Sequence, residues 1–505
     1  MLKKRLIGVR TVFMKQKKFY SLAAAAVLAL CFASCSSDSG GQSGGQPSGP
    51  GTAGDPFLVS SSADLLKVGK GTDGWTLSAH YKLTDDIDMT GVTWEPIGDF
   101  DETQIDGYDE SVDLITFIGT LNYDSAFRGS FDGNGKKILS FKVDSTVDST
   151  FGFVGLFGVV GPGGTVKNLG LDGVDIKGEG GVDRSAIGGI EGINFGTMEN
   201  CYVTGNVTGK PDSAGGIAGN NFGTIENCFT TCNVSGDRRV GGIVGDNHGP
   251  IKNCYVTGDV TGGSDDSAGG VAGLSGDNGT IKNCYVTGNV TSSGRSVGGV
   301  VGDIEGGTVE NCYATGNVSG NRCVGGVVGW NKGGTVKNCY ATGNVSGGER
   351  VGGVVGELSG RLSGSITGGT VENCYATGSV SGSEWVGGVV GLNYIGAVEN
   401  CVALNKVVTA TGGYDQVGRV AGGKDANATL SNNYARDNMA ITGPGYSADV
   451  GADKKDGADV TVATLNSTWW TALPWDFTGV WNNMDGSKLP TLKGVGWAQN
   501  PTVVP

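Results

Sequence analysis

Cysteine has the most obvious chemical potential in this 505-residue chain, where it occurs twelve times. Eight of the cysteines directly follow an asparagine and recur every 26 to 35 residues: Cys201, Cys228, Cys254, Cys284, Cys312, Cys339, Cys374 and Cys401. Zinc sites use closely spaced Cys-x-x-Cys pairs, and this spacing is nothing like them. We predict free, buried thiols at these eight positions, with disulfides between neighbouring copies or metal ligation as the alternatives.

The remaining polar residues form no constellation typical of catalysis. The two histidines, His80 and His248, lie far apart in sequence, and no His-Glu-x-x-His motif is present. His248 falls in the sequence Asp-Asn-His-Gly, where we predict a solvated turn residue. The sequence from Asp132 to Gly135 resembles half of a calcium loop, but a tight turn permitted by its glycines is the favoured interpretation. We therefore predict no catalytic residue, no metal and no cofactor.

The regular cysteines mark the register of a repeat that runs from about residue 186 to 413. Two successive copies read VGGVVGDIEGGTVENCYATGNVSG, from Val297, and VGGVVGWNKGGTVKNCYATGNVSG, from Val324. A fixed period of this size indicates a solenoid, a propeller or an array. The Val, Thr, Tyr and Gly content argues against helical repeats, and a propeller blade needs about 40 residues. The sequence predicts an all-β fold, a right-handed parallel β-helix (β-solenoid) of about 27-residue coils with a cap at each end.

Side-chain alternation within one copy places a corner at the asparagine. Val309 is apolar and Glu310 is charged, so Val309 points inward. Cys312, Ala314 and Val318 also point inward only if a bend at Asn311 reverses the alternation. We predict that the asparagines before the eight cysteines form an inward corner column, in which stacked amides hydrogen-bond from coil to coil.

The same alternation sends a column of aromatic residues outward, which makes it a candidate binding surface. The predicted ligand-binding residues are Tyr255, Tyr285, Tyr313, Tyr340 and Tyr375 of this column, with Trp330 and Trp385 at variable corner positions. Tyr202 and Phe229 continue the column, and a threonine column runs beside it. A flat aromatic and hydroxyl face suits a glycan or a protein. The alternative is that the rings merely stack and stiffen the sheet.

The N-terminal 35 residues are typical of a bacterial lipoprotein signal. Lysines precede an apolar run that is too short to cross a membrane and that ends in Phe-Ala-Ser-Cys, with Cys35 as the expected lipidation site. An ordinary secretory signal is the alternative, and translation starts at either Met1 or Met14. Residues 36–54, rich in Gly, Ser and Pro, predict a disordered tether. Loss of the seven Lys and Arg residues of the signal takes the net charge from −14 to −21, which disfavours nucleic acid as a partner.

The rest of the chain divides around the repeats. We expect an N-terminal cap with a short helix at 55–126, divergent coils at 127–185 and the regular repeats at 186–443. Residues 444–505 form a Trp-rich C-terminal cap that includes Trp470, Trp475 and Trp481. These aromatic residues are expected to plug the last coil, and an exposed tryptophan platform for sugar is the alternative.

The stretch GGVVGWNKGGTVKNCYATGNVSG resembles the GLUG motif. That resemblance implies a surface protein, since the motif occurs in bacterial surface proteins, some of them adhesin-like, and beside the catalytic domain of certain IgA-cleaving metallopeptidases. It implies no particular chemistry. The peptidase motif itself is missing from this sequence.

These observations lead to a hypothesis of a non-enzymatic, adhesin-like lipoprotein of the bacterial outer membrane. We expect a monomer, exposed at the cell surface and anchored only by lipid, that binds a glycan or protein on a host or neighbouring cell. A polysaccharide lyase or hydrolase and a passive surface stalk are the alternatives.

Asp-Ser-Ala and Asp-Ser-Thr triplets resemble O-glycosylation acceptors of gut Bacteroidetes, and they predict modification at Ser125, Ser145, Ser149, Ser213 and Ser267.

Overall fold

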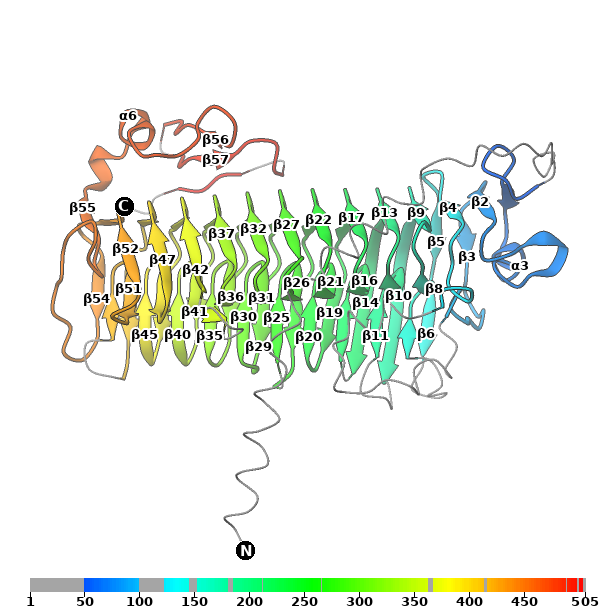
Figure 1. Cartoon of the computed structure of the whole chain (residues 1–505), viewed down its shortest axis with the longest axis horizontal. Helices are drawn as coiled ribbons and strands as arrows, with labels where there is room; N and C mark the ends of the chain where they lie inside the picture. The colour runs from blue at the N-terminus through cyan, green and yellow to red at the C-terminus, as the bar shows by residue number, and fades with distance from the viewer. Residues whose placement is uncertain are drawn as a thin grey trace, which may run out of the picture.

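The protein is a rod of stacked coils (Figure 1). The structure, a computed structural model, describes residues 50–99, 122–144, 152–179, 185–210, 212–264, 266–361, 367–412, 416–486, 488–496 and 499–502. The coils form a β-solenoid of about 13 turns with a repeat of about 28 residues. The predicted fold class is therefore confirmed.

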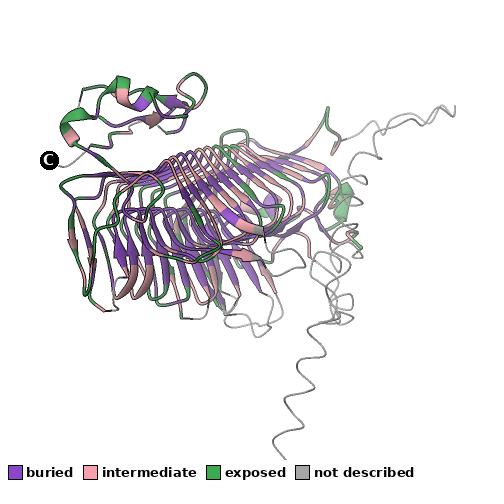
Figure 2. Ribbon diagram, turned by 60° about the vertical axis from the view of Figure 1, so that its left-hand side comes forward, coloured by how far each residue is buried: buried purple, intermediate pink, exposed green. Residues whose placement is uncertain are grey.

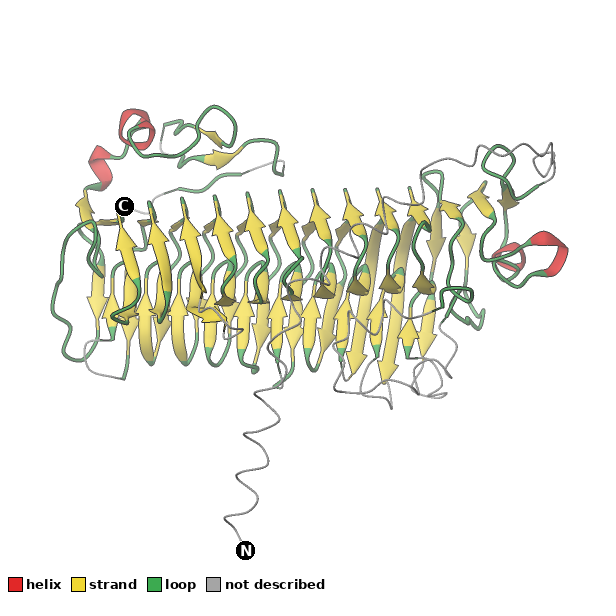
Figure 3. Ribbon diagram, viewed as in Figure 1, coloured by secondary structure: helices red, strands yellow, loops and turns green. Residues whose placement is uncertain are grey.

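One coil consists of five short strands separated by tight turns. In the coil around Cys312 they are β30 (Ser296–Gly298), β31 (Val301–Ile304), β32 (Thr308–Glu310), β33 (Tyr313–Ala314) and β34 (Val318–Ser319). Each strand pairs in parallel with its equivalent in the next coil, so that Val309 of β32 lies beside Val336 of β37 (Thr335–Lys337). Figure 3 shows the resulting columns of strands. Because every strand has a partner above and below, the coils satisfy one another's backbone groups.

A continuous apolar core fills the coils. Val301, Val309, Cys312, Ala314 and Val318 are each at most 1% exposed. The inward positions of Cys312, Ala314 and Val318 confirm the reversal of alternation that was predicted at Asn311.

The predicted corner exists, and a left-handed backbone forms it. Asn311 has φ 55°, and the other asparagines of the column share this conformation. Asparagine tolerates positive φ better than other non-glycine residues. The side chain of Asn338 donates to Asn311 at 3.1 Å, and that of Asn311 donates to Asn283 at 3.2 Å. The amides lie on the surface for most of the rod rather than inside it, and only Asn338 and Asn373 of the column are buried.

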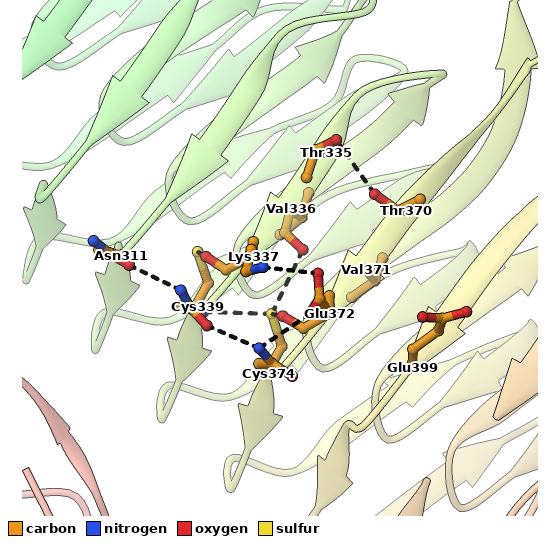
Figure 4. Close-up of polar contacts among 12 residues, drawn as sticks. Asn311, Thr335, Val336, Lys337, Cys339, Thr370, Val371, Glu372, Cys374 and Glu399 are labelled. Carbon is orange, nitrogen blue, oxygen red and sulfur yellow. Dashed lines mark hydrogen bonds and ion pairs between the residues drawn. The ribbon is translucent and has the colours of Figure 1, made fainter. Parts of the chain in front are cut away.

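The cysteine ladder lies directly behind this corner (Figure 4). Cys339 donates its thiol to the carbonyl of Lys337 at 3.1 Å and lies beside Cys374, whose sulfur accepts from the Cys339 amide at 3.4 Å. All eight ladder cysteines are fully buried, and the described cysteines are all free. The prediction of buried free thiols is confirmed. Parallel stacking explains it, because neighbouring side chains point the same way rather than toward each other.

A second asparagine ladder, which was not predicted from the sequence, runs inside the rod. Asn194, Asn221 and Asn247 are fully buried. Asn194 donates to Asn221 at 2.9 Å, and Asn221 donates to Asn247 at 2.8 Å. The repeated Asn before a Gly-containing turn was the available signal, and the amide chain satisfies groups that burial would otherwise penalise.

At the N-terminal end the coil stack is continued by further parallel strands. Strand β1 (Phe57–Val59) pairs with β2 (His80–Leu83), and β2 continues onto β4 (Ser130–Asp132) of the first coils. Between them lies α3 (Ser62–Leu65), whose N-cap Ser61 accepts a hydrogen bond from the Asp64 amide. No helix among the described residues is long and apolar enough to cross a membrane.

The C-terminal end differs from the prediction. Strand β55 (Ala458–Val460) adds to β53 (Tyr434–Arg436) and ends the stack. The following residues, with α6 (Ser467–Thr471), β56 (Trp481–Asn482) and β57 (Thr491–Leu492), fold back along the side of the rod (Figures 1 and 3). The Trp-rich part therefore does not plug the last coil. We call the described residues of 461–502 the C-terminal strap.

Candidate binding surface

The outward aromatic column forms a continuous stack, which we call the tyrosine ladder. It consists of Tyr202, Phe229, Tyr255, Tyr285, Tyr313, Tyr340 and Tyr375. Consecutive rings lie 4.7–5.1 Å apart with interplanar angles of 2–8°. Strand pairing sets this spacing, so the rings stiffen the sheet as cross-strand pairs do.

The C-terminal strap covers the last three rings of the tyrosine ladder. Tyr313, Tyr340 and Tyr375 are 4%, 1% and 0% exposed, beneath Trp470, Trp475 and Trp481. The Tyr375 hydroxyl donates to the Pro490 carbonyl at 2.8 Å, and the Tyr340 hydroxyl lies 3.0 Å from Gln499 Oε1. Figure 2 shows the strap lying against the coils.

Burial beneath the C-terminal strap removes several residues from the predicted ligand-binding site. Tyr313, Tyr340 and Tyr375 contact the chain's own C-terminus, so the prediction that they bind an external ligand is wrong for the folded protein. Tyr255 and Tyr285 stay half-buried. Among the described residues of the strap, Trp470 and Trp481 are fully buried, so they do not form the exposed tryptophan platform.

A different outward face varies from coil to coil. The chain turns sharply between β30 and β31, where a Cβ on Gly298 would come within 1.9 Å of the Val301 carbonyl oxygen. Side chains on both sides of this turn meet in the angle between two strand columns, where Asp303 and Cys323 are buried and Trp330 and Trp385 are half-buried. We call this the variable surface. One column carries Asn220, Asp246, Leu274, Asp303, Trp330, Glu357, Leu392 and Gly423, and the other carries Ser213, Arg239, Ser267, Ser296, Cys323, Arg350 and Trp385.

Near its N-terminal half the variable surface holds a charged cluster. Arg239 Nη1 lies 2.8 Å from Asp246 Oδ2, and His248 Nε2 lies 3.1 Å from Asp246 Oδ1. Burial opposes ionisation of Asp246, but the charges of His248 and Arg239 outweigh it and lower the pKa of Asp246 to about 2. Burial also works against charge on His248, yet Asp246 raises the pKa of that imidazole. The imidazole stacks on Phe222 at 4.9 Å.

The next polar group surrounds Trp330. Lys332 Nζ lies 2.6 Å from Asp303 Oδ2, 3.1 Å from Glu305 Oε1 and 4.1 Å from the Trp330 ring centroid. The indole nitrogen of Trp330 donates to Ser359 Oγ at 2.8 Å. Burial raises the pKa of Asp303 to about 7, although Lys332 opposes that shift. The indole is thus fixed in orientation and half-buried, as a contact residue should be.

The C-terminal half of the variable surface contains a pocket of 640 Å³. Arg350, Glu357, Trp385, Leu392 and Tyr394 are among its lining residues. Arg350 pairs with Glu357, and its guanidinium lies 5.5 Å from the Trp385 ring centroid. Trp330 and Trp385, which were predicted as contact residues, thus both lie on this surface but in different strand columns.

The prediction for His248 is wrong. Its side chain is 16% exposed, paired with Asp246 and stacked on Phe222 rather than solvated. Arg239, Asp246, Asp303, Arg350 and Glu357 were missed altogether. These residues could have been found from the sequence, because they occupy positions at which the otherwise repeated copies differ.

The remaining predicted sites have separate outcomes. Cys35, Ser145 and Ser149 lie outside the described residues. Ser213 and Ser267 are 3% and 1% exposed, so the folded chain does not present them for glycosylation, and Ser125 is half-buried.

Asn134 has φ 53°, and its amide donates to Asp132 Oδ1 at 2.8 Å, which fits the turn interpretation. No group of three or more metal-binding side chains occurs in the described ranges.

Five segments of the chain match the GLUG motif: residues 236–261, 266–291, 293–319, 320–346 and 382–408. Two curated relatives share part of the chain. A candidate Gly-rich membrane protein of Evansella cellulosilytica is 32% identical over 31% of this chain, and halomucin of Haloquadratum walsbyi is 33% identical over 32% of it. The matches span only 15% and 2% of those two proteins.

Among solved structures, a candidate immunoglobulin A1 protease from Bacteroides ovatus aligns with a TM-score of 0.33 and 18% identity. The alignment covers 88% of this chain and 94% of that one. The sequence matches and the observed coils agree on one description: the protein is a β-solenoid that contains GLUG-motif repeats.

Proposed function

We propose that this protein is a non-enzymatic, adhesin-like lipoprotein that binds a glycan chain on a host or microbial surface through its variable surface. The observation that carries the proposal is the coil-specific placement of aromatic and charged side chains on one face of an otherwise uniform rod. A repeat that served only as a spacer would have no need of Trp330, Arg350 and Trp385 at positions where other copies have small or different residues.

The chemistry of these side chains suits a saccharide. An indole offers an apolar face to a sugar ring, while arginine and carboxylate groups beside it offer directional hydrogen bonds to hydroxyls. Trp330 and Trp385 lie two coils apart, which corresponds to about 10 Å along the rod. An extended chain that follows the rod axis can contact both.

A cell-surface location is part of the proposal. Support comes from the signal-like segment ending at Cys35, the tether at 36–54 and the name of the Evansella relative. The net negative charge of the mature protein opposes edge-to-edge association of its β-strands, because like charges repel. We propose anchoring by several acyl chains on Cys35 in the outer membrane, with the rod outside the cell as a monomer.

A glycan array tests binding. The mature protein is expected to bind a subset of polysaccharides, and Trp330→Asn, which installs the residue found in the same column at Asn220, is expected to weaken that binding at least about tenfold. Tyr255→Thr on the tyrosine ladder is the matched control and should leave it unchanged. Binding to proteins but to no glycan, or loss of binding with Tyr255→Thr alone, contradicts the proposal.

Protease treatment of intact cells tests the location. Surface exposure predicts that added protease degrades the rod without lysis of the cells. Complete protection would place the protein behind the outer membrane and remove the adhesin function.

A polysaccharide-degrading enzyme is the second candidate, favoured by one observation. Asp246 and Asp303 lie on the same surface with pKa values shifted in opposite directions, to about 2 and about 7. Such divergence is typical of acid and base pairs. Both carboxylates are already ion-paired with Arg239 and Lys332, which ranks this function second. Release of reducing ends or unsaturated products from a polysaccharide, abolished by Asp303→Asn, would establish it.

A further inference from the structure

The pocket on the variable surface lies beside a position of the strand column that has no side chain. Gly423 is in register with Leu392, which in turn is in register with Glu357 and then Trp330. A Cβ on Gly423 would come within 2.5 Å of Trp385 Cδ1 and 3.0 Å of Leu392 Cδ1. The Trp385 indole and Leu392 therefore fill the place of the next side chain of the column, and the 640 Å³ pocket lies beside them.

Aromatic and aliphatic groups form the walls of this pocket. The Trp385 indole and Leu392 are half-buried, and Tyr394 is 50% exposed. Arg350 and Glu357 stand at one side, and Gln416, Lys424 and Asp425 complete the lining. This mixture of apolar faces and a few polar groups is typical of small-ligand sites, and the volume falls within their usual range of about 300–1,000 Å³.

Two lining residues have an unfavourable backbone conformation. Trp385 has φ 51° and Arg350 has φ 55°, in the left-handed region that bulky residues rarely adopt. The equivalent residues of the preceding coils, Ser296 and Cys323, are not among the residues with positive φ. Strain of this kind clusters at ligand sites, where the surrounding structure holds it in place.

Buried polar atoms in the pocket also lack partners. Within the described part of the chain, Gln416 Oε1 and Arg350 Nε are buried with no hydrogen-bond partner. The Gln416 amide and the Arg350 guanidinium line the pocket together with the Trp385 indole, and their donors and acceptor suit the hydroxyl and ring-oxygen groups of a sugar. A buried polar atom without a protein partner is a place where a ligand or a water can supply the missing hydrogen bond.

We infer that this pocket binds a single pyranose ring, stacked on Trp385 and hydrogen-bonded by Gln416 and Arg350. The inference rests on the proposed glycan-binding function and names the subsite that holds one sugar residue of the chain. The remainder of the glycan extends along the variable surface toward Trp330.

Saturation-transfer NMR with methyl pyranosides at millimolar concentration tests the subsite on the whole mature protein. The panel consists of the methyl glycosides of glucose, galactose, mannose and N-acetylglucosamine. Ring protons of at least one glycoside are expected to receive saturation from the wild type. Gly423→Leu, whose side chain would displace the Trp385 indole, and Trp385→Ser, which installs the residue of Ser296, are each expected to reduce that signal at least about tenfold.

Trp330→Asn is the matched control, since Trp330 lies on the variable surface but not in the pocket lining. It should retain the monosaccharide signal while weakening polysaccharide binding on the array. Polysaccharide binding that survives both Gly423→Leu and Trp385→Ser, with no monosaccharide signal in the wild type, overturns the subsite and leaves the proposed function standing. Absence of binding to every glycan overturns both. Thermal unfolding of each variant shows that a lost signal does not come from unfolding.

Discussion

The tyrosine ladder and the variable surface both face outward, yet they differ in every other respect. The ladder has an aromatic ring in each of seven successive coils, and the protein covers part of it with its own C-terminal strap. The variable surface changes its residue in nearly every coil and ends in an open pocket. Repetition in a solenoid serves the architecture, because aromatic side chains that recur at one position of each coil stack at the strand spacing. Departures from the repeat are where an individual function can be sought.

Removal of an aromatic group beneath the strap should have the largest effect. Trp470→Ala deletes a fully buried indole that packs on Tyr375 at 6.0 Å, and we expect a loss of about 3–5 kcal/mol in docking of the strap. Limited trypsin digestion should then cut the strap near Lys488 and Lys493. Trp330→Ala on the variable surface is the comparison variant and should leave the strap protected. Equal sensitivity of the two variants would contradict the division between the two faces.

A residue that departs from the repeat inside the core should lower the stability of the fold and should not contribute to binding. Glu191 replaces the apolar residue seen at Ala218 and Val244, is fully buried, and has no partner for either carboxylate oxygen within the described residues. Burial raises its pKa well above 4.5. We expect Glu191→Val to raise the free energy of unfolding by about 1–3 kcal/mol.

The pH dependence of that gain follows from linkage. The folded state keeps the Glu191 proton that the unfolded state loses, so the wild type loses stability as pH rises above 4.5 toward the folded pKa. The advantage of Glu191→Val should therefore grow over that interval in urea unfolding. A gain that does not change with pH would show that the carboxyl is already ionised in the fold.

The asparagine corner should contribute less per coil. Asn311→Ala places alanine in a left-handed conformation and removes one link of the amide column, with an expected cost of about 1–2 kcal/mol. Asn311→Gly removes the same hydrogen bonds but tolerates the backbone, so it should cost less. If urea midpoints of the two variants coincide, the corner depends on the amide column alone.

The smallest effect concerns the charged cluster of the variable surface. NMR titration of His248 should give a midpoint above 6.5, because Asp246 outweighs the burial of the ring. The stabilisation from this pair is complete below pH 6.5 and is lost as pH rises through the folded pKa. Asp246→Asn should lower the midpoint, and the His80 signal serves as the internal control. An unchanged midpoint would mean that the two side chains are not paired in solution.

Sequence patterns predicted much of the fold because the repeat tests each inference many times. The reversal at Asn311, the inward thiol of Cys312 and the helix after Ser61 are all local consequences of residue type and alternation. The binding surface was only partly predictable. Trp330 and Trp385 stood out as departures from the repeat, but the variable polar positions at Asp246, Asp303 and Glu357 resembled ordinary solvated residues until their partners were known.

By itself, the sequence determined the coil, its period, its corner and its buried thiols, since these depend on residues close together in one repeat. Contacts between distant segments determine which outward aromatic residues stay accessible. The C-terminal strap reaches back over Tyr375 and Tyr340, more than 90 residues earlier in the chain, and the sharp turn at Gly298 brings two columns of side chains into one angle. The physical reason is that burial of an outward side chain depends on what packs against it, and no local pattern records a contact between distant segments.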